Sequence, residues 1–253
     1  MSMFDLTGKV AIVTGGSRGI GFGIAQALAG AGATIVVAAT NVDQSVDAVR
    51  QLQASGATAA SVPTNVADAD AAMALVAQTL SRFGRLDILV NNAGINIRKR
   101  PEDYTVEEWH QVLSVNLDGP FFCSRAAYPA MKASGGGKII NIGSLMSIFA
   151  NAKASAYGAA KGGLVQLTKA LAVAWAQDGI QANAILPGWI DTELTQGARQ
   201  QLPGLEEAVQ ARTPEGRWGV PQDLGGAAVF LASSGSDFIT GTTLLVDGGF
   251  AAD

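Results

Sequence analysis

Short runs of consecutive apolar residues alternate along the chain with longer stretches in which apolar positions recur at helical spacing. The runs are apolar on successive residues, which predicts strands that are covered on both faces. A strand followed by a helix, many times over, predicts right-handed crossovers and a parallel sheet. The strand candidates, of which the last is the weakest, are Val10–Val13, Ile35–Ala38, Ile88–Val90, Ile139–Ile142, Ala182–Leu186, Leu244–Val246 and Ala59–Val62.

Helix starts can be recognised between these runs. Asp68 is placed to cap one helix, and Thr105 with Glu108 forms a Thr-x-x-Glu capping box at the start of a second, long one. Pro221 suits the first turn of a third. There is no internal repeat and no long linker. The pattern predicts a single α/β domain over residues 1–253, a Rossmann-type doubly wound parallel sheet with helices on both faces.

Composition narrows the function classes. Seventeen basic residues against 21 acidic ones give a net charge of −4, which argues against general nucleic-acid affinity. Cys123 is the only cysteine and His110 the only histidine, so disulfides, cysteine-pair metal sites and histidine-rich zinc sites are not expected. No stretch approaches the roughly 20 apolar residues that span a bilayer. We therefore expect no metal, no membrane partner and a cytoplasmic location.

A glycine-rich segment, Thr14-Gly15-Gly16-Ser17-Arg18-Gly19-Ile20-Gly21, directly follows the first predicted strand and opens an apolar helix. Glycines let the backbone approach a pyrophosphate, and a helix N-terminus supplies unpaired N–H donors. The spacing is Gly-x-x-x-Gly-x-Gly, not the commoner Gly-x-Gly-x-x-Gly. Its position between strand and helix predicts a dinucleotide site. That site would use Gly15, Ser17, Arg18, Gly19, Ile20 and Gly21.

Two further segments follow predicted strands, at the edge where ligands bind in parallel sheets. Asn65 and Val66 come after the third strand, where an adenine ring would lie, although they also suit a simple helix lead-in. Asn91-Asn92-Ala93-Gly94 ends the fourth strand. Its amides either pin a turn or border the ligand.

Tyr157 and Lys161 lie four residues apart on a predicted helix, and so on one face about one turn apart. A free tyrosine has a pKa of about 10, too high for efficient proton transfer at neutral pH. An ammonium about 4 Å away supplies on the order of 4 kcal/mol at an effective dielectric of 20. That energy would lower the pKa of Tyr157 by roughly two to three, at about 1.4 kcal/mol for each. Such pairs are common on solvated helices, so the interpretation depends on the surrounding residues.

Two of those residues support it. Ser144 follows the Ile139–Ile142 strand and precedes the Tyr157 helix, so its hydroxyl can polarise a substrate oxygen. Asn116 lies in the middle of the long helix that begins at Thr105, where an amide is otherwise poorly placed. It is suited to hold a water that links Lys161 to solvent.

With these motifs in order, the chain resembles the short-chain dehydrogenase/reductase family over nearly its whole length. The resemblance implies an NAD(P)-dependent oxidoreductase that assembles as a homotetramer through its two long middle helices and its C-terminal strand. It also implies a substrate lid from residue 193 to about 213. The motifs that carry it are Thr14-Gly15…Gly19-Ile20-Gly21, Asn91-Asn92-Ala93-Gly94, Ser144, Tyr157-x-x-x-Lys161 and Pro187-Gly188.

The resemblance also assigns roles. Lys161 is implied to bind the nicotinamide ribose as well as to act in catalysis. Ile190, through its backbone, and Thr192, through its side chain, are implied to meet the carboxamide. The implied catalytic residues are Asn116, Ser144, Tyr157 and Lys161; the further implied cofactor residues are Asn92, Ala93, Gly94, Tyr157, Pro187, Gly188, Ile190 and Thr192.

The end of the second predicted strand bears on cofactor choice. Enzymes that use NAD usually place a carboxylate there to hold the ribose 2′-hydroxyl. This chain has Ala39, Thr40 and Asn41 instead, while Asp43 is too far along and is suited to cap the next helix. Arg18, Thr40 and Asn41 can all donate to a 2′-phosphate. We therefore expect NADP, with NAD as the alternative.

The substrate is suggested by residues 95–100, which place three cations near the expected pocket mouth. With residues 212–219, this stretch resembles the gluconate 5-dehydrogenase and keto-deoxy-gluconate dehydrogenase branch, whose substrates are sugar acids. We expect Arg98 to hold the carboxylate, with Ser144 and Tyr157 at the reacting oxygen. An exposed loop is the other interpretation of these cations. Two other functions stay open, a 3-oxoacyl-carrier-protein reductase and a non-catalytic dinucleotide-binding regulator.

Overall fold

The computed structural model describes residues 2–252, so the two terminal residues of the expected 1–253 domain lie outside the described residues. One sheet of parallel strands runs in the order β3-β2-β1-β4-β5-β6-β7. Each observed strand contains its predicted range, including the weak candidate. The strands are β1 (Val10–Thr14), β2 (Thr34–Ala39), β3 (Ala59–Pro63), β4 (Ile88–Asn91), β5 (Gly137–Ile142), β6 (Ile180–Pro187) and β7 (Thr243–Val246).

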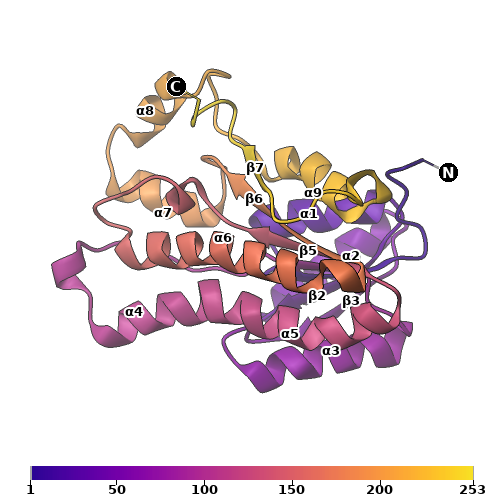
Figure 1. Ribbon diagram of the computed structural model, residues 1–253. Coiled ribbons are helices and arrows are strands. Elements are labelled where there is room, and N and C mark those ends of the chain that lie inside the picture. The colour runs from indigo at the N-terminus through magenta and orange to yellow at the C-terminus, as the bar shows by residue number, and fades with distance from the viewer. Residues whose placement is uncertain (1, 253) are drawn as a thin grey trace.

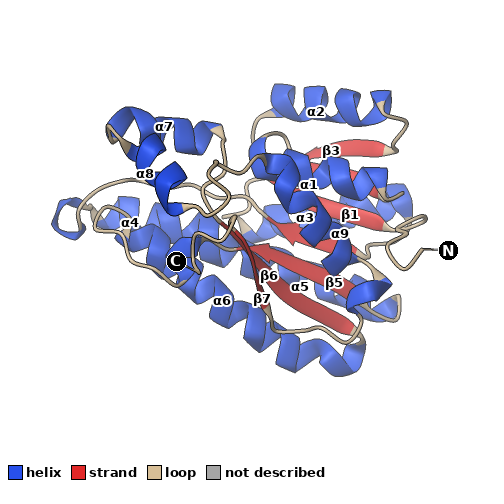
Figure 2. Cartoon of the chain, turned by 90° about the horizontal axis from the view of Figure 1, so that it is seen from above, coloured by secondary structure: helices blue, strands red, loops and turns tan. Residues whose placement is uncertain are grey.

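Helices cover both faces of the sheet, as Figure 2 shows. The helices α1 (Gly19–Gly30), α2 (Val42–Ala54) and α9 (Gly225–Ala232) pack on one face, and α3 (Ala69–Phe83), α5 (Gly119–Ala133) and α6 (Ser155–Trp175) on the other. Alternate residues of β1 serve the two cores: Ala11 and Val13 the first, Val10 and Ile12 the second. This double burial explains why the strands are apolar on successive residues.

The remaining helices lie toward the carboxyl ends of the strands. They are α4 (Val106–Leu113), α7 (Glu193–Gln201) and α8 (Leu205–Arg212). Figure 1 shows α7 and α8 set apart from the sheet, in the region expected to form the lid. Among residues 2–252, no helix is long and apolar enough to cross a membrane.

The long helix expected from Thr105 is interrupted. Its capping box is present, with Thr105 Oγ1 accepting from the Glu108 N–H at 3.2 Å. However, α4 ends at Leu113, and a π-helical turn over Ser114–Asp118 separates it from α5. Asn116 Nδ2 donates to the Val112 carbonyl at 2.8 Å, and a side chain that competes for such a carbonyl favours this widening. The helix expected from Pro221 likewise opens with a 3₁₀ turn before α9.

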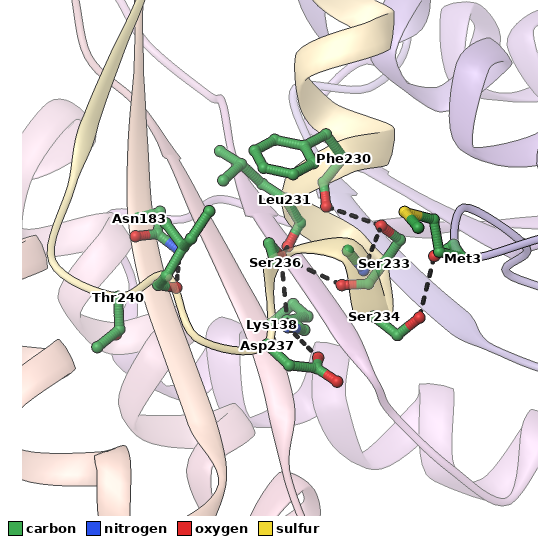
Figure 3. A network of polar contacts seen from close by, with 12 residues as sticks. Met3, Lys138, Asn183, Phe230, Leu231, Ser233, Ser234, Ser236, Asp237 and Thr240 are labelled. Carbon is green, nitrogen blue, oxygen red and sulfur yellow. Dashed lines mark hydrogen bonds and ion pairs between the residues drawn. The ribbon is translucent and has the colours of Figure 1, made fainter.

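A network of hydrogen bonds and ion pairs, shown in Figure 3, links the segment between α9 and β7 to β5 and to the N-terminal residues at the amino end of the sheet. Lys138, near the start of β5, donates to Asp237 at 2.8 Å and to Ser236 at 3.4 Å. Ser234 Oγ donates to the Met3 carbonyl at 3.0 Å. These contacts lie at the amino ends of the strands. The candidate site lies at the opposite, carboxyl ends.

Candidate active site

A cleft of about 620 Å³ lies over the carboxyl ends of the strands, where the strand order reverses between β1 and β4. This reversal is the position at which doubly wound sheets bind ligands. Every cofactor-binding residue expected from the sequence lines the cleft, and so do Arg98, Ser144, Tyr157 and Lys161. Asn116 is the one expected site residue that does not line it.

The glycine loop forms the cofactor end of the cleft. Gly15 and Gly19 have positive φ angles of 62° and 53°. A Cβ atom at Gly21 would lie 2.3 Å from the Gly15 carbonyl oxygen and 2.4 Å from Asn92 Nδ2. The side chain of Arg18, at the N-cap of α1, makes no capping hydrogen bond. The glycine loop thus packs closely against itself and against Asn92. Its backbone and the N-terminus of α1 remain available to an anionic group.

The end of β2 contributes Ala39, Thr40 and Asn41 to the lining and contains no carboxylate. The Asn41 side chain caps α2 by accepting from the Gln44 N–H at 3.0 Å. The structure therefore corrects the suggestion that Asp43 is the cap, since Asp43 lies in the first turn of α2. This cap uses the side-chain oxygen Oδ1 of Asn41. The side-chain NH₂ of Asn41 and the hydroxyl of Thr40 remain available as donors.

The two amides at the end of β4 have different environments. Asn91 is buried and donates to Asn141 Oδ1 at 2.8 Å, so it belongs to the interior. Asn92 lines the cleft, and its Nδ2 donates to the Gly15 carbonyl at 3.1 Å. Asn65 also lines the cleft while accepting from the Ala67 N–H at 3.2 Å. Asn65 and Asn92 thus each fix a turn and border the site.

The opposite wall carries the side chains expected to do the chemistry. β5 ends at Ile142, Ser144 begins a 3₁₀ turn, and α6 starts at Ser155. Tyr157 is therefore in the first turn of α6, with Lys161 one turn further along. Burial raises the pKa of the Tyr157 phenol, and its hydrogen bond with the Ser144 hydroxyl offsets part of that increase. The sequence correctly predicted that these side chains come together.

The Lys161 side chain is buried in the wall, only 3% exposed. Its Nζ donates to the Ile142 carbonyl oxygen at 2.7 Å and lies 5.6 Å from the centre of the Tyr157 ring. Burial lowers the pKa of Lys161 to about 8. With this pKa, Lys161 still carries its proton at pH 7 and loses it at mildly alkaline pH.

The protonation of Tyr157 differs from the sequence-based expectation. Burial raises the pKa of Tyr157, and the effects that lower it come from Ser144 and Arg98. The expected net lowering of the Tyr157 pKa by Lys161 is therefore wrong for this structure, because burial of the phenol outweighs the effects that lower its pKa, and those effects come from Ser144 and Arg98. At neutral pH the phenol holds its proton.

The lowered pKa of Lys161 predicts a pH-dependent stability. Between about pH 8 and 10.5 the folded chain has released a proton that the unfolded chain still holds, so stability increases as pH rises through this window. Below this window, the buried charge costs up to about 3.5 kcal/mol, at about 1.4 kcal/mol for each unit of pKa. Lys161→Met, which carries no charge, should lack this gain. Urea unfolding at pH 7 and pH 10, without cofactor, measures the difference.

Lys169→Met is the matched control, because Lys169 lies on the same helix and is exposed. The control should track the wild type at both pH values. Parallel stability curves for Lys161→Met and wild type across the window would show that Lys161 does not titrate there.

Asn116 is fully buried behind the cleft. Its Nδ2 donates to the Ile95 and Val112 carbonyls at 2.9 and 2.8 Å, while its Oδ1 has no hydrogen-bond partner among the described residues. A Cβ atom at Gly94 would lie 2.7 Å from this Oδ1 and 3.7 Å from Lys161 Nζ. Asn116 Oδ1 and the Lys161 ammonium thus both lie close to the position that a side chain at Gly94 would occupy.

The three cations of residues 95–100 have different partners. Lys99 and Arg100 each form an ion pair with a nearby glutamate at an N–O distance of 2.5 Å. Arg98 is half-buried, lines the cleft and donates to the Leu194 carbonyl at 3.5 Å. It is near enough to Tyr157 for each to affect the pKa of the other. The exposed-loop interpretation thus describes Arg100, whereas Lys99 is half-buried against Glu108 and Arg98 lines the site.

Sequence reasoning missed several lining residues. Met146, Asn151, Lys153 and Trp189 all line the cleft. Trp189 directly follows the Pro-Gly motif, and Lys153 lies four residues before Tyr157. These positions next to known motifs were the only features of the sequence that could have indicated a place in the site. The backbone bridge from Lys99 to Ala154, which places Lys153 beside the loop of Arg98, is a tertiary contact that no local pattern predicts.

The single histidine and the single cysteine of the chain lie outside the cleft lining. His110 is exposed on the last turn of α4 and does not line the cleft. Cys123 is buried in α5, where burial raises its pKa to about 12. Among residues 2–252, no group of three or more His, Cys, Asp or Glu side chains is placed to hold a metal ion.

Comparison with known proteins gives a consistent result. The family model described as enoyl-(acyl carrier protein) reductase matches residues 15–251. The 2-dehydro-3-deoxy-D-gluconate 5-dehydrogenase of Dickeya dadantii (strain 3937) is 40% identical over 253 residues, covering 100% of this chain and 99% of that one. The enzyme of the same name from Bacillus subtilis (strain 168) is 44% identical over 248 residues, covering 98% and 96%.

A solved structure agrees with these relatives. The gluconate 5-dehydrogenase from Burkholderia cenocepacia J2315, in complex with NADP and tartrate, has a TM-score of 0.95 and 41% identity, covering 99% of this chain and 98% of that one. These names support the sugar-acid interpretation of the sequence over the 3-oxoacyl-carrier-protein reductase alternative. The regulator alternative also lacks support, since the relatives are enzymes. The chain belongs to the short-chain dehydrogenase/reductase family and is an oxidoreductase.

Proposed function

We propose that this enzyme transfers a hydride between NADP(H) and the secondary alcohol or ketone of a sugar acid. The observation that carries the proposal is the position of Arg98, a half-buried guanidinium in the cleft that interacts electrostatically with Tyr157. An arginine fork binds a carboxylate through two parallel hydrogen bonds. A carboxylate held by Arg98 would bring a nearby carbon–oxygen group of the same small molecule to the phenol.

The residues present fit the phosphorylated cofactor. The closely packed glycine loop and the open N-terminus of α1 suit the pyrophosphate, since a Cβ at Gly21 would meet the Gly15 carbonyl. When bound, the cofactor supplies or accepts the hydride. The residues proposed to hold it are Gly15, Ser17, Gly19, Ile20 and Gly21 at the pyrophosphate; Arg18, Thr40 and Asn41 at the 2′-phosphate; Asn65 and Val66 at the adenine; and Asn92, Ala93, Gly94, Tyr157, Lys161, Pro187, Gly188, Ile190 and Thr192 toward the nicotinamide.

The chain's own residues handle the proton. In reduction, Tyr157 donates its phenolic proton to the ketone oxygen while Ser144 hydrogen-bonds to that oxygen. The raised pKa of Tyr157 suits this direction, because the phenol is protonated at neutral pH. In oxidation Tyr157 must accept a proton from the alcohol, and the positive charge of Arg98, which lowers the pKa of Tyr157, favours the phenolate that accepts it.

Asn116 and Lys161 are proposed to return the proton to solvent. The unpartnered Asn116 Oδ1 and the Lys161 ammonium flank the same point behind Gly94. A water held there by Asn116 would link Lys161 to the outside. Asn116 contributes as a positioning residue, because its amide is fixed by two backbone carbonyls.

Cofactor choice gives a testable prediction. NADPH should be preferred over NADH, since the Ala39-Thr40-Asn41 strand end has no carboxylate to repel a phosphate. Ala39→Asp should shift the ratio of catalytic efficiencies toward NADH by about ten- to hundredfold, the range for a charged hydrogen bond of roughly 1.5–3 kcal/mol. Steady-state kinetics with both cofactors measure it. Ala39→Asn is the control of nearly equal size, and a wild type that clearly favours NADH would contradict the assignment.

Residues 193–213 are proposed to act as the substrate lid. Glu193, Leu194, Thr195 and Leu202 line the cleft, so movement of α7 would open or cover it. We propose a homotetramer formed through α5, α6 and β7, supported by exposed apolar side chains on those elements, Phe121, Val173 and Leu245. A cytoplasmic location, where this cofactor is available, completes the proposal. A monomer mass from light scattering would contradict the tetramer.

The proposed function is tested by a cofactor-consumption screen. The purified enzyme is assayed with sugar acids, neutral polyols and acetoacetyl thioesters, each with both nicotinamide cofactors and in both directions. We expect NADP(H)-dependent activity on sugar acids or their keto forms to exceed activity on the other two classes. Strong activity on acetoacetyl thioesters with none on sugar acids would overturn the substrate assignment.

A further inference from the structure

An ion pair joins the two sides of the cleft at its cofactor end. Arg18, the N-cap of α1, donates from NH1 to Glu193 Oε2 at the first residue of α7. Both side chains line the cleft. Close by, a Cβ atom at Gly19 would lie 3.4 Å from Thr192 Cγ2. The start of the proposed lid therefore rests on the glycine loop.

The other contacts of α7 are made with parts of the chain outside the glycine loop. Arg98 donates to the Leu194 carbonyl from the substrate side. Arg199, in the last turn of α7, pairs with Asp191 at 2.9 Å and stacks over the Trp218 ring at 4.0 Å. These contacts hold α7 against the loop of residues 95–100, which contains Arg98, and against the segment after β6. The pair between Arg18 and Glu193 instead connects α7 to the glycine loop.

We propose that Glu193 is a further determinant of cofactor choice, because its carboxylate competes with the 2′-phosphate of NADP(H) for Arg18. Binding of the phosphorylated cofactor then exchanges the partner of Arg18 and releases the first turn of α7. This inference rests on the proposed function, in which Arg18 binds the 2′-phosphate. NAD(H) has no such phosphate and leaves the ion pair in place.

Charge and exposure favour the exchange. A phosphate monoester carries a charge of about −1.5 to −2 at neutral pH, against −1 for a carboxylate. The Arg18 and Glu193 side chains are 58% and 61% exposed, so their pair is weak and easily displaced. Glu193 therefore lowers affinity for the phosphorylated cofactor by a small factor and couples the lid to the presence of the phosphate.

Calorimetric titration with 2′,5′-ADP and 5′-AMP isolates the 2′-phosphate from the nicotinamide. Glu193→Gln should bind 2′,5′-ADP about two- to fivefold more tightly than wild type, the range for loss of an exposed ion pair. Its affinity for 5′-AMP should be unchanged. Glu207→Gln, the same change at an exposed position on α8, is the matched control and should alter neither affinity.

A double-mutant cycle tests whether the effect acts through Arg18. In an Arg18→Gln background, Glu193→Gln should no longer improve 2′,5′-ADP binding. Hydrogen exchange gives an independent readout: amides of the first turn of α7 should exchange faster with saturating 2′,5′-ADP than with 5′-AMP in the wild type. In Glu193→Gln the two ligands should give the same rates.

The outcomes separate the two proposals. If wild type binds 2′,5′-ADP no better than 5′-AMP, the proposed preference for NADP fails and the role of Glu193 fails with it. If wild type prefers 2′,5′-ADP through Arg18, but Glu193→Gln leaves that affinity and the exchange of α7 unchanged, the proposed cofactor stands and the role of Glu193 is overturned.

Discussion

Replacing Tyr157 with phenylalanine is expected to remove turnover while leaving cofactor binding nearly intact. The ring keeps its place in the first turn of α6, and the hydroxyl that bonds to Ser144 is lost. Acid/base catalysis by a positioned side chain contributes about 10²–10⁴ in rate. We therefore expect kcat to fall by at least about a hundredfold. Initial rates at saturating substrate, with a fluorescence titration of NADPH, measure the two effects separately.

Tyr128→Phe is the matched control for this variant. The Tyr128 hydroxyl donates to Asp178 Oδ2 at 2.8 Å, and its side chain packs against Trp175, away from the cleft lining. Losing it should leave kcat unchanged. A Tyr157→Phe enzyme with a kcat near that of wild type would mean that another group supplies the proton.

Replacing Arg98 with alanine is expected to weaken catalysis on acid substrates strongly and on neutral ketones little. Arg98 is the cation of residues 95–100 that lines the cleft without an ion pair among the described residues. A charged hydrogen bond contributes roughly 1.5–3 kcal/mol. The catalytic efficiency on a sugar acid should therefore fall about ten- to hundredfold. The comparison is kcat/KM for a sugar acid against that for a neutral ketone, measured on the same preparation.

Arg100→Ala supplies the control, because Arg100 pairs with Glu102 and does not line the cleft. It should alter neither efficiency. Equal losses on acid and neutral substrates in Arg98→Ala would remove Arg98 from the carboxylate site. They would instead point to its electrostatic effect on Tyr157, which all substrates share.

The sheet was predictable because its strands are buried on both faces. Residues such as Ala11 and Ile12 enter opposite cores, so successive positions must all be apolar, and that signal is local. The helix after β1 was likewise marked by its glycines. What the local pattern did not show was the π turn at Ser114–Asp118, since it depends on where the Asn116 amide finds its carbonyl partners.

The residues of the candidate site were also largely predictable, because parallel strands bring their carboxyl ends to one edge. Motifs that follow β1, β4 and β5 must therefore meet, and the glycine loop, Asn92 and Ser144 do line one cleft. The sequence alone determined which segments form the site. Spacing on one helix likewise placed Tyr157 and Lys161 together.

Only the tertiary structure decided the electrostatics of the site. The Lys161 ammonium is hydrogen-bonded to the Ile142 carbonyl oxygen, and burial lowers the pKa of Lys161 and raises that of Tyr157. Arg98 lines the cleft while Lys99 and Arg100 pair with glutamates, and Arg18 pairs with Glu193, 175 residues away. Burial and long-range ion pairs depend on distances between segments remote in the chain, so periodicity and motif spacing, which are local, do not contain them.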